Sequence, residues 1–379
     1  MPTPAPVSAL LRRTPTVARL PNRALIAISG TQASEFLNGI LATSIPNPPR
    51  PFYSTFLHAQ GRVLYDVFVH TPPVSSDPST KQPTFLIEYD PSVPSRNSDA
   101  PSLLTLLKRY VLRAKVRLRD ATAEHDIWAA WGSEREDKAE VPRWEWAGSG
   151  AGEQVWGRSS WPWGEGEHGL LKDRRAIGMG VRRLVKKGDR PQECSTHDGG
   201  SEEDYLLHRI AHGVAEGATD IPPLNAFPME SNLDIMGGLD FRKGCYVGQE
   251  LTVRTYHTGV VRKRIYPVVI HSSSSYVQFP IFTADGPLSM NTHTPQTPIR
   301  ASPTHSPGEG RVPRPRGTGA LLSNTQGVGL ALLRLEHVDK VQTGDLKLEL
   351  ASAEGEPLRV TPWRSEYWPV PEPSKEEDP

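Results

Sequence analysis

Between Arg23 and Gly132 the chain alternates short apolar runs with segments of helical periodicity, and this alternation restricts the fold more than any other feature. Two segments, 31–45 and 103–115, carry their apolar residues on one helical face. The predicted strands lie at 23–30, on both sides of Gln60 within 56–70, at 84–90, at 115–121 and at 126–132. This order predicts an α+β fold that contains a ferredoxin-like α/β sandwich.

Composition narrows the class of protein. The 379 residues are enough for two or three domains. The formal net charge is zero, so no overall field attracts nucleic acid or a membrane surface. Two cysteines cannot form a disulfide framework, which favours a reducing compartment. Because no apolar run reaches the ~18 residues that span a bilayer, we expect no membrane span, no nucleic-acid partner and a monomer when the protein is alone.

The two ends of the chain differ in charge. Residues 1–20 contain Arg12, Arg13 and Arg19, and no Asp or Glu occurs before Glu35. This composition predicts either the remnant of a matrix-targeting segment or a Pro-rich disordered tail. The other end, 371–379, is acidic, and we expect it to be solvated.

Two internal segments interrupt the pattern. The segment 133–169 is rich in Gly, Glu and Trp, and seven of the nine tryptophans lie between Trp128 and Trp163. Tryptophans can stack on bases or on a flat cofactor, but no basic groove accompanies these, so a packed surface hairpin is the favoured interpretation. The segment 271–316 is dense in Ser, Thr, Pro and Gly, which predicts a disordered insertion. The alternating strands after it predict a small C-terminal β-barrel or β-sandwich.

Cys245 lies in the sequence DFRKGCYVGQELTVRT, between Gly244 and Gly248 and next to Arg242 and Lys243. Nearby cations favour the thiolate, which is the reactive and metal-binding form of cysteine. The two glycines allow a tight turn or the close approach of a ligand. Residues 242–264 contain six Lys or Arg and one acid, Glu250. This context predicts an activated thiol, and the alternative is a free cysteine packed as a small hydrophobic residue.

Such a thiol can be a ligand to an iron–sulfur cluster. One cysteine cannot assemble a cluster site alone, because these sites usually take four cysteine thiolates. Cys194, in a polar loop, and His257, which we place near a strand end, are weak additional candidates. A partner would therefore supply the other ligands. The sequence has no HExxH, P-loop or GxSxG motif and no GxGxxG in a βαβ context, so hydrolase and nucleotide-binding functions have no support.

The octapeptide KGCYVGQE resembles the signature of the folate-binding proteins related to the glycine-cleavage T-protein, in the YgfZ-type branch. The longer segment PLNAFPMESNLDIMGGLDFRKGCYVGQELTVRTYHTGVVRKR is similar to the eukaryotic mitochondrial members of that branch, which act in iron–sulfur cluster assembly. The resemblance runs from about Ala18 to Trp368 and leaves out 133–169 and 271–316. The residues that match the signature are Lys243, Gly244, Cys245, Tyr246, Gly248, Gln249 and Glu250.

The resemblance implies a three-domain ring around a folate-sized cavity, with a T-protein-like region of two interleaved subdomains at 21–265 and a β-barrel at 266–370. It implies a mitochondrial matrix protein that acts late in [4Fe-4S] assembly with A-type cluster carriers, for clients such as aconitase-like and lipoyl-synthase-type enzymes. The candidate cofactors that it implies are tetrahydrofolate and a [2Fe-2S] or [4Fe-4S] cluster that Cys245 shares with a partner. The implied folate-pocket residues are Asp66, Arg209, Asn232 and Arg254.

Two departures from the family pattern bear on activity. In GRVLYD, Tyr65 and Asp66 stand where the transferase has paired acids, and in LLHRIAHG, Ala211 stands where an acid is common. The lost acids would position an amine-bearing substrate and bind the donor edge of a pterin. We therefore expect an accessory assembly protein without ordinary turnover. A folate-dependent aminomethyl or one-carbon transferase, and a folate-sensing or purely structural scaffold, are the alternatives.

Overall fold

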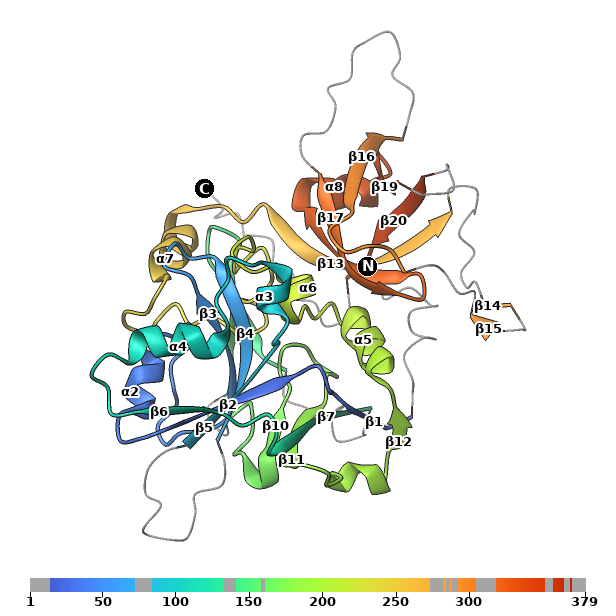
Figure 1. Cartoon of the computed structure of the whole chain (residues 1–379). Helices are drawn as coiled ribbons and strands as arrows, with labels where there is room; N and C mark the ends of the chain where they lie inside the picture. The colour runs from blue at the N-terminus through green and yellow to red at the C-terminus, as the bar shows by residue number, and fades with distance from the viewer. Residues whose placement is uncertain are drawn as a thin grey trace.

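The computed structural model describes residues 14–71, 84–132, 141–157, 161–272, 282–283, 286–287, 292–304, 318–351, 357–364 and 369. This part of the chain contains two five-stranded sheets, two small hairpins and a closed six-stranded barrel. Short helices connect the sheets and lie against them (Figure 1). None of the described helices is long and apolar enough to cross a membrane.

The first sheet has the order β3-β4-β5-β2-β6, and its strand pairs are antiparallel. Its strands are β2 (Ala24–Ser29), β3 (Phe52–Leu57), β4 (Val63–His70), β5 (Thr84–Tyr89) and β6 (Arg117–Asp120), accompanied by α2 (Ala33–Asn38), α3 (Val93–Arg96) and α4 (Leu103–Val111). Without the edge strand β3, the order of strands and helices is that of a ferredoxin-like sandwich. The predicted α+β fold is therefore confirmed.

The second sheet has the order β10-β11-β7-β1-β12. Its strands are β1 (Thr16–Arg19), β7 (His125–Trp131), β10 (Leu170–Lys172), β11 (Val181–Lys186) and β12 (Asp198–Gly200), and the 3-10 turns η2 (Glu167–Gly169) and η3 (Gln192–Ser195) lie between them in sequence. Two predictions are corrected here. The strand at 126–132 belongs to this sheet and not to the first one. The tail expected over 1–20 contains β1, whose Val17 and Ala18 are buried between β7 and β12; residues 1–13 lie outside the described residues.

The Trp-rich segment forms a hairpin of β8 (Arg143–Trp146) and β9 (Gly152–Val155). Trp163, after the hairpin, is buried and stacks on Tyr53 of β3, with ring centroids 6.1 Å apart. These contacts agree with the packed interpretation of this segment, although 133–140 and 158–160 lie outside the described residues.

The barrel follows the order β13-β18-β17-β16-β19-β20. Its strands are β13 (Lys263–Ser272), β16 (Pro298–Pro303), β17 (Gly319–Thr325), β18 (Val328–Arg334), β19 (Leu346–Leu350) and β20 (Leu358–Pro362), with α8 (Leu335–Gln342) after β18 and the small hairpin β14 (Phe282–Thr283) and β15 (Gly286–Pro287) between β13 and β16. The insertion predicted at 271–316 is wrong at β16, because this strand pairs with β17 and β19 and buries Ile299 completely. Residues 273–281 and 305–317 lie outside the described residues.

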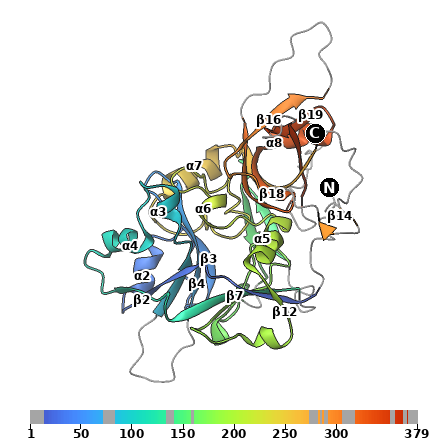
Figure 2. The same ribbon diagram turned by 45° about the vertical axis from the view of Figure 1, so that its right-hand side comes forward.

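Two helices lie between the sheets and the barrel, as Figure 2 shows. They are α5 (Glu202–Ala211) and α6 (Gly217–Asp220), and both pack against β17. Ser201 and Asp204 form a capping box that fixes the start of α5. One apolar core runs through both sheets and a second one fills the barrel. The region between them, and the loop before α7 (Gln249–Thr258), position the residues that the sequence singled out.

Candidate functional site

The loop that carries Cys245 is attached to the segment after α2. At its start, Asp240 donates its backbone N–H to the Ala42 carbonyl at 3.0 Å, and its side chain accepts from the Ser44 hydroxyl at 2.6 Å. At its end, Val247 donates its backbone N–H to the Gly39 carbonyl at 3.2 Å. The loop is therefore held on both sides of the cysteine.

The two cations beside the cysteine make structural contacts. The Lys243 ammonium donates to the carbonyls of Asn38, Leu41 and Thr43 at 2.8, 2.7 and 3.2 Å. Burial lowers its pKa to about 8, although Asp240 opposes this shift. The Arg242 guanidinium pairs with two acids of the β8–β9 hairpin, Glu145 at 2.7 Å and Glu153 at 3.2 Å. Their contacts fix the loop to α2 and to the hairpin, and the role of these cations in thiol activation stays a prediction.

The second half of the signature forms the turn into α7. Gly248 has φ of 82°, and a Cβ at this position would lie 2.4 Å from the His58 carbonyl oxygen. Tyr246 is buried, which raises its pKa to about 12, and its backbone N–H donates to the Gln249 side chain at 3.2 Å. The Lys243 ammonium lies 5.0 Å from the centroid of the tyrosine ring. These contacts shape the turn into α7, and none of them involves Cys245.

Cys245 is exposed, as expected for a thiol that meets a partner, and so is the adjacent Gly244. A Cβ on Gly244 would meet no atom within 4 Å, so this glycine is not needed for packing. Cys194 is partly buried in η3, and burial raises the pKa of its thiol while Arg190 opposes the shift. No group of three or more His, Cys, Asp or Glu in the described ranges is arranged to hold a metal ion. Among the described residues, Cys245 therefore has no such group beside it that would complete a metal site.

Helix α7 presents one exposed face, formed by Glu250, Val253, Arg254 and His257. His257 lies in the last turn of this helix, in an edge contact with Tyr256, and not near a strand end as predicted. The basic segment 242–264 also presents fewer cations to the surface than its sequence suggests. Its last residue, Arg264, is buried and forms two hydrogen bonds with the Asp234 carboxylate, at 2.6 and 2.8 Å.

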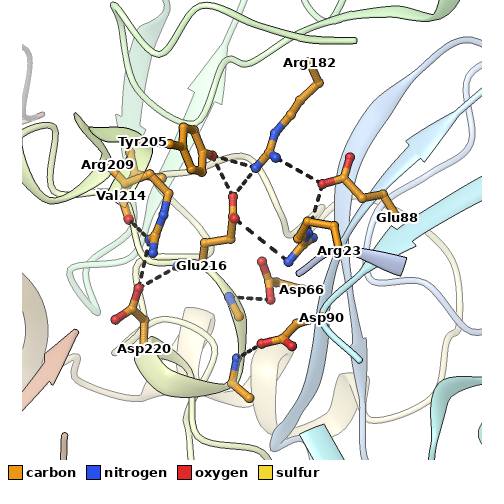
Figure 3. Close-up of polar contacts among 12 residues, drawn as sticks. Arg23, Asp66, Glu88, Asp90, Arg182, Tyr205, Arg209, Val214, Glu216 and Asp220 are labelled. Carbon is orange, nitrogen blue, oxygen red and sulfur yellow. Dashed lines mark hydrogen bonds and ion pairs between the residues drawn. The ribbon is translucent and has the colours of Figure 1, made fainter. Parts of the chain in front are cut away.

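Two of the four folate-pocket candidates lie close together, on either side of Glu216 in Figure 3. Asp66 accepts from the Gly217 backbone N–H at 3.0 Å, and burial raises its pKa although Arg23 opposes this. Arg209 donates to the Val214 carbonyl at 2.8 Å and to Asp220 at 2.9 Å. Both side chains are thus already engaged by the protein itself.

The other two candidates lie elsewhere. Asn232 is buried and donates to the Ile265 carbonyl at 2.7 Å, whereas Arg254 is exposed on α7. Tyr65, in place of an acid, donates to the Pro101 carbonyl at 2.7 Å. A cavity of about 530 Å³ lies beside Arg209, but its wall holds more acids than arginines: Asp90, Glu202, Glu203 and Glu216 against Arg23, Arg96 and Arg209. This arrangement does not fit an anionic folate held by the four predicted residues.

A network of buried charges connects the two sheets, and the sequence analysis missed it (Figure 3). Glu88 of β5 accepts from Arg23 at 3.0 Å and pairs at 3.2 Å with Arg182 of β11. Glu216 accepts from the Tyr205 hydroxyl at 2.9 Å and also pairs with Arg182. The one signal in the sequence was an acid, Glu88, within an otherwise apolar strand.

The arginines keep both carboxylates of this network ionised. Burial alone would raise the pKa of Glu88, but Arg182 and Arg23 outweigh it and lower the pKa to about 2. The same balance holds the pKa of Glu216 well below its ordinary value. The buried carboxylates of this network are therefore paired with arginines of the protein itself.

A large open cavity lies next to the start of the signature loop. Its volume is about 820 Å³, and its wall includes Asp240, Glu153, Tyr53, Trp161 and Trp163. The Trp-rich segment, which lies outside the family resemblance, thus forms part of the surface beside the loop.

The comparisons with known proteins agree with this geometry. The structure is similar to the glycine cleavage system aminomethyltransferase T of Bartonella henselae, with a TM-score of 0.54 at 12% identity over 96% of this chain and 88% of that one. Residues 262–370 match the family described as the C-terminal β-barrel domain of CAF17. By fold, the protein is thus of the aminomethyltransferase T type with a C-terminal barrel.

Curated relatives define the family more narrowly. The chain is 37% identical over 340 residues to the mitochondrial iron–sulfur cluster assembly factor IBA57 homolog of Cryptococcus neoformans, covering 86% of this chain and 85% of that protein. It is 32% identical to the homolog of Mycosarcoma maydis, over 94% and 86% of the two chains, and 38% identical to that of Aspergillus fumigatus, over 86% and 72%. The chain belongs to the IBA57 family of mitochondrial iron–sulfur cluster assembly factors.

Proposed function

We propose that this protein is an accessory factor for late [4Fe-4S] cluster assembly in the mitochondrial matrix, and that Cys245 is its ligand to the cluster. The cluster is cargo, held mainly by an A-type carrier, and the clients are enzymes of the aconitase and lipoyl-synthase types. The observation that carries the proposal is the exposed thiol on a loop fixed at both ends, in a chain that belongs to the IBA57 family.

The loop suits a shared ligand because its backbone is already ordered before the partner arrives. Hydrogen bonds from Asp240 and Val247 hold the loop, so binding costs little further conformational entropy. Because Gly244 has no side chain and has open space around it, the backbone of a partner can approach the thiol closely. In the exchange, the Cys245 thiol loses a proton and its sulfur binds iron, while the displaced ligand leaves the iron. This step needs no net electron transfer.

The test compares Cys245→Ser with Cys194→Ser in the full chain. Each variant is mixed anaerobically with an A-type carrier, iron and sulfide, and absorption and EPR spectra report the cluster that stays in the complex. We expect Cys245→Ser to lower cluster retention because serine is a poorer iron ligand, and Cys194→Ser to behave as the wild type. Equal retention by both variants would contradict the role of the Cys245 thiol.

We further infer that any folate binds weakly and without aminomethyl transfer. Tyr65 and Ala211 replace acids, and Asp66 and Arg209 already have partners. A hydrogen bond to a charged group contributes roughly 1.5–3 kcal/mol, so losing one weakens binding about tenfold or more. Calorimetry with tetrahydrofolate and an assay for methylene transfer from an aminomethyl-lipoyl donor test this. Measurable transfer would restore the alternative function, a folate-dependent transferase.

A further inference from the structure

A cavity of about 160 Å³ lies beneath α7. Its wall includes Leu251 and Thr255 of the helix, Val260 after the helix, and Phe227, Met229 and the acid Glu230 from the segment before the signature. Most of these side chains are apolar. The volume is close to the ~150 Å³ of an engineered apolar cavity that accepts benzene. The cavity therefore has the size of one large apolar side chain.

Two valines at the same helix remain uncovered. Val260 is 64% exposed and Val253 is 37% exposed, and the other large hydrophobic residues with such exposure in the described ranges are Leu112 and Val141. Helix α7 lies at the edge of the molecule (Figure 1). Burying a valine contributes about 1.5–3 kcal/mol. Val260 lines the open cavity, whereas Val253 lies on the exposed face of the helix. An exposed valine in the wall of a mostly apolar cavity offers a partner an apolar contact.

The charges around the cavity indicate the chemistry of that partner. From Glu250 to Lys263 the chain has one acid, Glu250, and three cations, Arg254, Arg262 and Lys263. The wall adds a second acid, Glu230, so the cations still outnumber the acids. Arg254 and Arg262 are exposed, and Lys263 is half-buried. A segment with acidic residues would be attracted to this surface, and like charges would be repelled.

We propose that the cavity beneath α7 is the anchoring pocket for the cluster carrier, and that it receives a large apolar side chain of the carrier flanked by acidic residues. This inference rests on the proposed function. The ten residues of α7 extend about 15 Å, so Cys245 and the pocket fit within one interface of roughly 800 Å² per partner. The pocket fixes the position of the carrier, and the thiol supplies the ligand.

The test uses Val260→Asp in the full chain, with Leu112→Asp as the matched control. Calorimetry with a purified metal-free A-type carrier measures Kd, and melting curves report the fold. Both residues are exposed, so we expect both variants to fold. We expect Val260→Asp to raise Kd tenfold or more, because a buried unpaired charge replaces an apolar contact, and Leu112→Asp to leave Kd within about twofold of the wild type. An unchanged Kd for Val260→Asp would contradict the proposal that this cavity anchors the carrier.

Metal-free binding separates this inference from the proposed function. Cys245→Ser should bind the metal-free carrier as the wild type does and lose only the cluster. If the wild type and Val260→Asp bind the carrier equally well, the proposal of an anchoring pocket is wrong, while the proposed role of the thiol is unaffected. If the wild-type protein does not bind the carrier, the proposed function fails and the pocket with it. A photo-crosslinker at position 260 should capture a carrier peptide with an apolar residue between acids, and capture of a basic peptide would contradict the proposal.

Discussion

At the scale of single residues, the two glycines of the signature have different roles. Gly248 has positive φ and lies against the His58 carbonyl, whereas Gly244 has open space around it. We expect Gly248→Ala to lower the free energy of unfolding by at least about 1 kcal/mol, because positive φ strains an L-residue and the Cβ clashes. Gly244→Ala should change it by less than about 0.5 kcal/mol. Urea unfolding measures both, and equal losses would contradict the distinction.

The two cations of the signature can be separated in the same way. Lys243→Met removes hydrogen bonds to three backbone carbonyls, so we expect it to lower the free energy of unfolding by about 1.5–3 kcal/mol. Arg242→Met breaks the ion pairs of an exposed guanidinium with Glu145 and Glu153, and ion pairs at the surface contribute about 0–1 kcal/mol. Thermal and urea unfolding of the two variants check this. A larger loss for Arg242→Met would show that the hairpin contact, and not α2, holds the loop.

The sequence was sufficient to locate the signature and to expect an exposed thiol. It was not sufficient to assign Arg242 and Lys243, because adjacency along the chain does not fix the direction of a long side chain. Their partners come from the end of α2 and from the β8–β9 hairpin, which are distant in sequence. Only the tertiary fold brings these groups together.

At the scale of elements, β16 lies within the insertion predicted at 271–316, and a substitution in this strand tests whether it belongs to the barrel. Ile299 is fully buried between β17 and β19, while Arg300 next to it points outward and is exposed. We expect Ile299→Ala to lower the free energy of unfolding by about 2–5 kcal/mol, because it leaves a cavity in the barrel core. Arg300→Ala should cost less than about 0.5 kcal/mol. If Ile299→Ala unfolds like the wild type in urea, β16 is not part of the barrel core.

The strands most easily predicted were those with long apolar runs, such as β4 and β5. Strand β16 was missed because PIRASP has two prolines and one large apolar residue, and its pairing partners supply most of the contacts. Strand β7 was recognised as a strand but assigned to the first sheet. Local pattern does not specify which sheet a strand joins, and its partners β1 and β11 lie on either side of it at large sequence separation.

At the scale of the whole molecule, buried ion pairs connect the two sheets, and no local pattern predicted this. Arg23, Glu88, Arg182 and Glu216 come from four separate elements or loops. Each charge is unfavourable when buried alone and stable only with its partners. The pairing therefore makes the approach of the sheets specific, since a small displacement would leave a buried charge unpaired.

The network should dominate the response of the fold to acid. The pKa of Glu88 is lowered to about 2 in the folded protein, from an ordinary value near 4.5. Its stabilising contribution is therefore fully present above pH 4.5 and is lost as the pH falls from 4.5 towards 2.

We expect Glu88→Gln to lower the free energy of unfolding at neutral pH by about 3–5 kcal/mol, because Arg23 and Arg182 lose a buried partner. It should also flatten the dependence of stability on pH between 4.5 and 2. Urea unfolding across this range, with the exposed Glu35→Gln as control, measures both effects. An unchanged slope for Glu88→Gln would show that other carboxylates carry the acid response and that the two sheets do not depend on this pair.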